Sequence, residues 1–446
     1  MGEAAKTSLK AIGKQDMYLL SNDPDNSFFN NINRQHSEFR KYHRSKRVHN
    51  PGQVLGWPFA QTVKVQFDPR NMGDLLSNMY LSIDMPGLTP GSNENYADQL
   101  GRHIIKSATI FVDDIELEKI HDDWGILYDE LYLETSEKVA NRFLVNRNLG
   151  YDASSSNPQF AVYESKLLIP VHFFFSRKYA SDEYATNKPN RPYFPLCAIH
   201  KQKIEIVFEF HKQSFFTDSA TRLELTSFNV ITEEITVSPD ERHYLANTPH
   251  VLVTDLVRKH PSIVTDLNKD TIKNNLVPNI PVKCIHWFLR NTKFEDENVA
   301  TGSPAPGDDE LYNIHNRFNF SSNVNFDETY TFFAPVMADS NFNINGNKMP
   351  NVTKTGHTYY KYLMPFHKRL SRPTRNIYTY SFSMNPVNVE PSGSLDFSQI
   401  QSDKTNIELK LDTSLVNIQT DTYTLHMYYT GYQTFSFERG FMSVAY

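Results

Sequence analysis

The sequence predicts an all-β protein with two domains, and three observations lead to this prediction. Aromatic residues make up 13% of the chain, including 31 Phe and 24 Tyr, and aromatic and β-branched residues favour strands. Most of the apolar segments alternate polar and apolar residues, which is the pattern of a strand with one buried face. The length of 446 residues exceeds what one compact core normally holds and suits two domains of about 200 residues each.

Half-buried strands are predicted wherever this alternation is regular. The clearest segments are 62–67 (TVKVQF), 203–210 (KIEIVFEF), 377–384 (IYTYSFSM) and 407–412 (IELKLD). Shorter candidates are 108–114, 223–231, 282–289 and 317–326. Stretches rich in Gly, Pro, Ser and Asn separate them and are predicted to be loops. Many short strands joined by long loops indicate a sandwich or a jelly roll, because parallel α/β units would alternate strands with helices.

Helical patterns are scarce in this sequence. The best one runs from Asp122 to Val139, where apolar side chains recur every three to four residues behind acidic residues suited to a helix N-terminus. A second, shorter helix is predicted with Ser238 as its N-cap and Pro239 in its first position. Because this helix lies near the middle of the chain, we place the domain boundary at 230–245. No short-period repeat is visible, so any duplication would be structural.

Charge and cysteine content exclude several classes of protein. The chain has 45 Lys and Arg against 51 Asp and Glu, a net charge of −6, so nucleic acid is not an expected partner. One basic segment, 34–47, holds six Lys and Arg against one Glu. We interpret it as a solvated or subunit-facing segment, with phosphate binding as the alternative. Cys197 and Cys284 lie in apolar runs and are predicted to be buried free thiols in a reducing compartment.

Targeting and modification signals are weak. No stretch reaches the roughly 18 to 20 apolar residues of a membrane span, and the N-terminus lacks an apolar signal-peptide region. We therefore expect a soluble protein that is not secreted by the ordinary route. Sequons at Asn319 and Asn351 would be glycosylated only where that machinery is present. The start Met1–Gly2 lacks the Ser or Thr that myristoylation requires at position 6.

No catalytic, cofactor-binding or metal-binding residues are predicted. The sequence contains no GxSxG, HExxH or GxxxxGK[ST] motif, no GxGxxG after a strand, and no HxH among its 16 His. His286 and Trp287 lie in an apolar run and are predicted to be core residues. Three acidic pairs sit where turns or helix starts favour acidic residues: Asp113–Asp114, Asp122–Asp123 and Asp308–Asp309.

Several segments, in order along the chain, are similar to one protein family. They are QDMYLLSNDPDNSFFNNINRQHSEF (15–39), NMGDLLSNMYLSIDMP (71–86), LLIPVHFFFSR (167–177), PLCAIHKQKIEIVFEF (195–210), NIYTYSFSMNPVNVEPSGSLDFSQI (376–400) and GFMSVAY (440–446). With these segments the sequence resembles the double jelly-roll major capsid proteins of the nucleocytoplasmic large DNA viruses. The PSGSLDFS run at 391–398 is the most specific part. Glu390, where that family usually has Gln, and Phe174, where Trp is common, are modest departures.

The resemblance implies two consecutive eight-stranded antiparallel jelly rolls with a few short helices in loops. It implies an N-terminal arm (1–25), a first jelly roll (26–232), a linker (233–244) and a second jelly roll (245–446). In that family three copies form a capsomer with a pseudo-sixfold outline, and capsomers tile an icosahedral capsid. The implied protein is a structural component of the virion, assembled in the host cytoplasm, with no enzymatic activity and no cofactor.

The implied partners are other copies of the chain, within the homotrimer and in neighbouring capsomers, together with minor capsid or cement proteins. Apolar residues interspersed with lysines in the arm suit docking under the shell, near an inner membrane or inner protein. No direct contact with nucleic acid is expected.

Two other functions stay open on the residues alone. A carbohydrate-binding or carbohydrate-cleaving β-sandwich would use the aromatic residues as sugar platforms and the acidic residues as catalysts. A minor capsid or penton component would share the strand pattern. The two predicted domains argue against a penton protein, because such proteins usually carry a single jelly roll.

The acidic loop 295–310 (EDENVATGSPAPGDDE) carries six acidic residues and no basic one. Its Pro and Gly residues block regular structure, and burial of its charges would be costly. We therefore expect the whole loop to project from the second jelly roll toward the outside of the particle.

The segment 391–400 (PSGSLDFSQI) is predicted to be a rigid elbow between two strands. Pro391 fixes one backbone angle, and Gly393 can take a positive φ. Ser392 and Ser394 can hydrogen-bond the nearby backbone, and Phe397 and Ile400 are expected to enter the core as a short helical turn. The alternative is a polar ligand pocket made of Ser392, Asp396 and Ser398.

Overall fold

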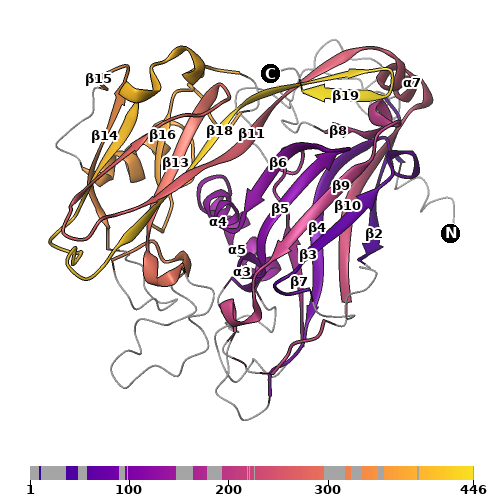
Figure 1. The fold of residues 1–446 in the computed structure, drawn as a ribbon. Helices are drawn as coiled ribbons and strands as arrows, with labels where there is room; N and C mark the ends of the chain where they lie inside the picture. Colours follow the sequence, from indigo (N-terminus) through magenta and orange to yellow (C-terminus); the bar gives the residue numbers. More distant parts are fainter. Residues whose placement is uncertain are drawn as a thin grey trace, which may run out of the picture.

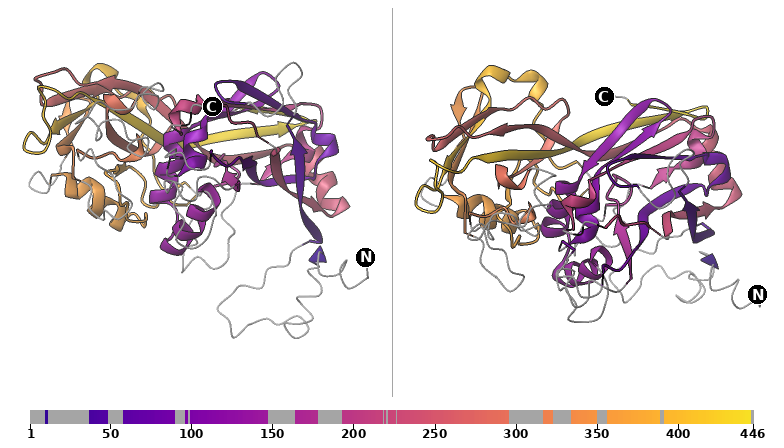
Figure 2. Two further views of the ribbon diagram at one scale, coloured as in Figure 1. Left: turned by 90° about the horizontal axis from the view of Figure 1, so that it is seen from below. Right: turned by 60° about the horizontal axis from the view of Figure 1, so that its bottom comes forward.

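The computed structural model describes residues 10–11, 37–48, 58–89, 96–97, 99–146, 164–177, 193–217, 219, 221–225, 227–295, 317–322, 334–349, 356–388 and 391–444. These residues form two halves that lie side by side, each made of two antiparallel sheets (Figure 1, Figure 2). Apart from Lys10–Ala11, the predicted arm lies outside the described residues.

The first half contains one sheet in the order β2-β10-β4-β7 and a second in the order β3-β9-β5-β6. Two short strands extend the first sheet, because β1 (Lys10–Ala11) pairs with β2 and β8 (Phe194–Pro195) pairs with β4. The eight main strands are β2 (Phe39–Arg47), β3 (Thr62–Phe67), β4 (Leu75–Met85), β5 (Ile105–Val112), β6 (Ile115–His121), β7 (Ser165–Pro170), β9 (Ile204–Phe210) and β10 (Ser227–Val237).

The second half contains one sheet in the order β11-β18-β13-β16 and a second in the order β12-β17-β14-β15. An additional strand, β19 (Phe441–Val444), pairs with the far end of β18. The eight main strands are β11 (His250–Val264), β12 (Thr271–Asn275), β13 (Val282–Asn291), β14 (Met337–Ile344), β15 (Asn347–Lys348), β16 (Tyr378–Ser381), β17 (Asn406–Leu411) and β18 (Tyr423–Glu438).

Both halves have the same strand order. Counted from one to eight within each half, the main strands of the described residues run 1-8-3-6 in one sheet and 2-7-4-5 in the other. All pairs are antiparallel, so each half is an eight-stranded jelly roll. The predicted fold class is therefore confirmed. The two halves are duplicates in topology, although the sequence retains no visible repeat.

The regular alternation of the sequence gives the strands that it predicted. Strand β3 occupies 62–67 and buries Val63, Val65 and Phe67 while the residues between them stay exposed. Strand β17 likewise buries Ile407, Leu409 and Leu411. Each strand hydrogen-bonds to its sheet through its backbone, and the side chains of one face pack into the sandwich core. Cys197 and Cys284 are buried free thiols, as predicted.

The predicted helix 122–139 is wrong as a single element. The structure has two helices, α4 (Asp122–Leu131) and α5 (Thr135–Val145). Glu134 starts the second helix through a capping box, in which the Glu137 carboxylate accepts a hydrogen bond from the Glu134 backbone N–H at 3.1 Å. The second predicted helix is confirmed: α7 (Pro239–Asn247) begins after Ser238, whose hydroxyl accepts from the Glu241 backbone N–H.

Two strand predictions need correction. The described part of 317–326 forms a short turn and not a strand, because Phe320 has a positive φ of 52° that no strand allows. The strand predicted at 377–384 ends at Ser381, where β16 ends. Beyond it Met384 is 80% exposed rather than part of a buried face.

Two clusters of buried apolar side chains fill the molecule. One lies within the second jelly roll and contains Trp287 and Phe397. The other fills the first jelly roll and continues into the second half through Phe288, Tyr428 and Phe435. The two halves therefore share apolar core at their junction. No helix among the described residues is long and apolar enough to span a membrane.

Candidate functional site

The sequence predicts no catalytic or metal-binding residues, and the described part of the chain contains no group of three or more His, Cys, Asp or Glu placed to bind a metal ion. Its chemically distinctive region is the junction between the two halves. Helix α4 lies there, between the sheets of the first and second halves (Figure 1). Buried acidic, basic and histidine side chains from both halves meet around it, and this junction is our candidate functional site.

The start of α4 forms buried ion pairs with the second half. The Asp123 carboxylate is paired with the guanidinium of Arg290 on β13, and both side chains are 1% exposed. The Asp122 carboxylate lies 2.9 Å from the Arg317 guanidinium and 3.1 Å from His211 Nε2. Burial alone would raise the pKa of Asp122, but Arg317, His211 and Arg290 together lower it well below its usual value. The Asp122 and Asp123 carboxylates at the start of α4 are therefore held in the charged form.

Glu295 extends this cluster within the second half. Its carboxylate lies 3.3 Å from Arg290 Nη1 and 2.7 Å from His426 Nε2. Burial opposes its charge, yet Arg290 and His426 lower the pKa of Glu295. The prediction that the entire acidic loop projects outward is thus wrong for its first residue, because a basic partner on β13 compensates the burial of Glu295. Residues 296–310 lie outside the described residues.

A second cluster joins β6 to the edge strand of the second half. Glu118 on β6 accepts hydrogen bonds from Arg177 Nη1 at 2.7 Å and from the Val257 backbone N–H of β11 at 2.8 Å. Burial raises the pKa of Glu118, while Arg177 acts in the opposite direction. Arg177 also reaches Asp255 at 3.3 Å, and Asp255 pairs with Lys283 on β13. The first half thereby covers a polar backbone edge of the second.

A third set of contacts fixes the C-terminal end of α4. The Glu130 carboxylate pairs with Arg375 and accepts a hydrogen bond from the Thr374 backbone N–H at 2.8 Å. Ser371 donates its backbone N–H to the Leu131 carbonyl at 2.7 Å and its hydroxyl to the Leu133 carbonyl at 2.6 Å. The carbonyl of Leu131, the last residue of α4, and that of Leu133 just beyond it are therefore satisfied by the second half.

Aromatic side chains fill the space between these charges. The Trp124 ring of α4 lies 5.9 Å from the Tyr428 ring and 6.0 Å from the His286 ring, measured between centroids. The Tyr132 hydroxyl is 3.0 Å from His286 Nε2, and His286 Nδ1 is 2.9 Å from the Thr379 hydroxyl. The predicted core positions of His286 and Trp287 are confirmed, since both are fully buried.

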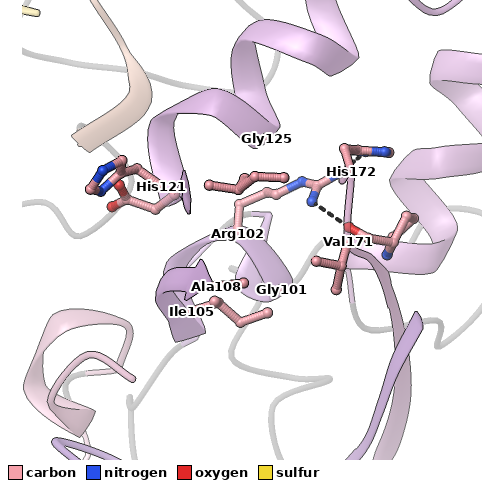
Figure 3. A pocket seen from close by; sticks show the side chains of 11 residues that line it. Gly101, Arg102, Ile105, Ala108, His121, Gly125, Val171 and His172 are labelled. Carbon is pink, nitrogen blue, oxygen red and sulfur yellow. Dashed lines mark hydrogen bonds between the residues drawn. The ribbon is translucent and has the colours of Figure 1, made fainter. Parts of the chain in front are cut away.

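A small cavity opens beside α4, and Figure 3 shows Arg102 pointing from it toward His172. Its volume is about 30 Å³, which is close to the share of one water molecule in the liquid and far below the several hundred Å³ of a typical ligand pocket. Arg102 also forms a bidentate pair with Asp129, at 3.0 Å for each bond. This cavity has no room for a sugar ring.

The carboxylates of the junction differ in pKa. A glycosidase acid needs a raised pKa and a second carboxylate across the sugar. Asp122, Asp123 and Glu130 have a lowered pKa because basic side chains contact them, whereas burial raises the pKa of Glu118, which is hydrogen-bonded to Arg177. Burial also lowers the pKa of His172 to about 4. Asp122, Asp123 and Glu130 pair with Arg317, Arg290 and Arg375 of the second half, so these carboxylates join the two halves.

The structure also describes Asp113 and Asn319, which the sequence singled out. Asp113 has a φ of 51° in the β5–β6 turn and accepts the Lys203 backbone N–H at 2.9 Å, as expected of a turn residue. Asn319 is 3% exposed, which is incompatible with a glycan on the folded protein. Residues 308–309 and 351–353 lie outside the described residues.

The segment 391–400 has the main features of the predicted elbow. It connects β16 with β17, strands of different sheets, and Gly393 has a φ of 124°. Ser392 Oγ accepts the Asn385 backbone N–H at 3.0 Å, and Phe397 is buried in the second core. Ile400 is only half-buried and lies outside that core, so its predicted place was wrong.

Sequence reasoning missed the basic partners of the acidic pair. Arg290 ends the apolar run of β13, and Glu118 is a buried charged residue within β6. A charged residue at a buried strand position was the available signal, because such a charge needs a partner. The identity of the partner was not readable, since Asp123 and Arg290 are 167 residues apart.

Two family models together match nearly the whole chain. One, described as the N-terminus of the major capsid protein, matches residues 27–239. The other, described as the large eukaryotic DNA virus major capsid protein, matches residues 241–443. They meet at α7, where the sequence places the linker between the jelly rolls.

Known proteins of this kind cover the chain at low identity. The major capsid protein of Pyramimonas orientalis virus is 25% identical over 411 residues, 90% of this chain and 90% of that protein. That of Paramecium bursaria Chlorella virus 1 is 21% identical over 407 residues, 89% and 85% of the two chains.

Solved structures show the same fold. PBCV-1 VP54 superposes with a TM-score of 0.71 at 17% identity, covering 94% of this chain and 100% of that one. The Faustovirus major capsid protein gives a TM-score of 0.66 at 11% identity, covering 95% and 97%.

Proposed function

The chain belongs to the major capsid proteins of large eukaryotic DNA viruses, and we propose that it acts as the subunit of a homotrimeric capsomer. Three copies would present six jelly rolls in a ring with a pseudo-sixfold outline. Such capsomers would tile an icosahedral capsid. As a major capsid protein the chain is a component of the virion, and we infer that it is assembled in the host cytoplasm, in keeping with its buried free thiols.

The observation that carries the proposal is the junction between two jelly rolls of identical strand order. Buried ion pairs such as Asp123–Arg290 fix one half on the other. A subunit that presents two similar units at a fixed angle contributes two adjacent sectors of a ring. The division into an arm (1–25), two jelly rolls (26–232 and 245–446) and a linker (233–244) is part of this proposal.

Further partners follow from the same role. We infer contacts with minor capsid or cement proteins, and a contact of the arm with an inner membrane. Direct binding of nucleic acid is not part of the proposal, because the net charge is −6 and the basic residues of β2 include two, Lys41 and Arg44, that pair with Glu233 and Glu234.

We also propose that the protein is not an enzyme. The carboxylates of Asp122, Asp123 and Glu130 in the junction are held charged by Arg317, Arg290 and Arg375. A carbohydrate-binding β-sandwich is the alternative function, for which exposed aromatic residues would be required. Phe366 is such a residue, but an apolar side chain of this kind also suits a contact between subunits.

Size-exclusion chromatography with light scattering tests the proposal. A capsomer should have three times the chain mass of 51.6 kDa, and electron microscopy should show particles with a pseudo-hexagonal outline. A monomer that is retained on an oligosaccharide column would instead support the carbohydrate-binding alternative.

A further inference from the structure

Three elements of the first jelly roll form its contact with the second. They are the fifth strand β6, the helix α4 that follows it, and the segment after the sixth strand β7. Glu118 of β6 accepts a hydrogen bond from Val257 of β11. Asp123 of α4 forms an ion pair with Arg290. In the segment after β7, the Phe174 ring lies 5.3 Å from the Phe435 ring of the second half.

The second jelly roll has counterparts of all three elements, because both halves share one strand order. Its fifth strand is β15 (Asn347–Lys348), and it is followed by a helical segment made of η7 (Tyr359–Leu363) and α8 (Met364–His367). The segment after its sixth strand, β16, contains Met384. Among the described residues, the main contacts of η7 and α8 are with each other and with β16 of the same half.

These counterparts carry the most exposed large apolar side chains of the described residues. Met384 is 80% exposed and Phe366 is 78% exposed, and Leu363 beside them is 37% exposed. The two segments are held together, since Lys368 Nζ donates to the Ser383 carbonyl at 2.7 Å. An exposed apolar patch on fixed elements is typical of a contact with another protein.

The surface that would receive this patch is also present. Within one chain, α4 and β6 of the first half contact β11, β13 and β18. These are the first, third and eighth strands of the second half. Their counterparts in the first half are β2, β4 and β10. Strand β2, whose outer side pairs within the described chain only with the two-residue β1, has no fully buried side chain over its nine residues. In Figure 1 β15 and β2 lie at opposite ends of the molecule, as a head-to-tail contact between copies requires.

We propose that the contact between two copies of this chain repeats the contact between its two halves. The patch formed by Leu363, Phe366 and Met384 would pack on the β2-β10-β4 sheet of the next copy. This inference rests on the proposed trimer and names its surfaces. The contact is heterologous, so it closes after three copies if each step from one jelly roll to the next turns by about 60°.

The two contacts differ in chemistry. The junction within the chain contains buried ion pairs, whereas the contact between copies presents apolar side chains from α8 and from the segment after β16. A single basic substitution in the patch should therefore place a charge against the basic strand β2, which has the sequence FRKYHRSKR, and should weaken the contact. Because Phe366 and Met384 are exposed in the single chain, the same substitution should leave each subunit folded.

The first test compares Phe366→Lys and Met384→Lys with Tyr244→Lys as the matched control. Tyr244 is 57% exposed on α7, away from the patch. In light scattering both patch variants should fall from three times 51.6 kDa to 51.6 kDa, and the control should stay trimeric. Tryptophan fluorescence should show folded subunits in all three variants. Trimeric patch variants would overturn the inference while leaving the proposed trimer intact.

The second test locates the contact without any substitution. Trimers assembled from a mixture of isotopically heavy and light chains are treated with an amine-reactive cross-linker and analysed by mass spectrometry. Lys348 on β15 should link to Lys41 or Lys46 on β2, with heavy–light pairs present. Wild-type trimers in which Lys348 links to other regions of the neighbouring chain would refute the assigned surfaces. A wild-type protein that is monomeric would refute the proposed trimer itself, and this inference with it.

Discussion

The guanidinium of Arg290, on β13 of the second jelly roll, is paired with the Asp123 carboxylate at the start of α4, between the two jelly rolls. Lys259 lies 3.5 Å from the same carboxylate, and the Tyr428 hydroxyl donates to it at 3.3 Å. A helix N-terminus also favours an acidic residue. Asp123 therefore stabilises the N-terminus of α4 and also joins the two halves.

Removal of Arg290 should destabilise the protein strongly. Arg290→Met would leave Asp123 charged and buried with fewer partners, and breaking a buried pair in this way costs about 3–5 kcal/mol. Urea unfolding followed by tryptophan fluorescence measures this loss. The exposed pair Lys269–Asp266 offers a control, and Lys269→Met should change stability by about 1 kcal/mol or less. Equal effects of the two substitutions would contradict the structural role of Arg290.

The junction should weaken as pH falls from about 6.5 to 4. Burial lowers the pKa of His172 and His121 to about 4 and that of His286 to about 3, while unfolded His has a pKa of about 6.5. The unfolded state then binds more protons in this range, so stability is complete above pH 6.5 and falls with decreasing pH. A single histidine whose pKa is about 6.5 unfolded and about 4 folded contributes about 3 kcal/mol to the free energy of unfolding, and this contribution is lost as the pH falls between these values.

Urea unfolding measured from pH 8 to pH 4 checks this prediction. His172→Gln should make the decline with decreasing pH shallower. His243→Gln, on the exposed face of α7, should leave the slope unchanged. A wild-type midpoint that stays constant between pH 6.5 and 4 would exclude the buried neutral histidines as the cause.

Local patterns predicted the strands, and long-range pairing had to come from the structure. Alternation identifies β3 and β17 because the burial of each residue depends on its own position in the strand. The strand order and the partner of Asp123 depend on which segments meet in space, and no local pattern contains that information. The break between α4 and α5 was readable in principle, since Glu134 and Glu137 have the spacing of a capping box.

The acidic loop should be dispensable beyond its first residue. Replacement of 296–310 by a short Gly-Ser turn, with Glu295 retained, should leave the melting temperature of the trimer within a few degrees. Glu295→Ala should be more harmful, because Arg290 and His426 lose a buried acceptor, at a cost of about 1–3 kcal/mol. Thermal melting of both variants, with oligomeric state measured alongside, distinguishes them. Loss of trimers in the loop variant alone would make the loop an interface element.

The N-terminal arm should be removable from the free trimer. Residues 1–25 have too few apolar side chains to form a core of their own. Lys10–Ala11 pair with β2 of the same chain, and we expect the rest of the arm to become ordered only by contact with neighbours. Limited proteolysis followed by mass spectrometry should show cleavage within 1–25 while light scattering still reports a trimer. An arm as resistant as the jelly rolls would contradict this expectation.

The elbow 391–400 should depend on Phe397 and not on Asp396. The Phe397 ring is 6% exposed and lies 6.0 Å from the Phe382 ring in the second core, so Phe397→Ala should cost about 3–5 kcal/mol. Asp396 is at the surface, and its carboxylate only accepts the Ser398 backbone N–H at 2.9 Å and bonds of neighbouring side chains. Asp396→Asn should therefore have little effect on the yield of folded trimer.

Denaturant unfolding and trimer yield of the two variants decide between the elbow and a ligand pocket. In the structure Ser392 bonds Asn385 and Ser383, whereas Ser398 bonds Asp396. The three polar residues of the alternative pocket therefore have partners in two separate groups. A stable Phe397→Ala protein combined with an inactive or unassembled Asp396→Asn protein would reverse this ranking, and the elbow would then have to be regarded as a binding site.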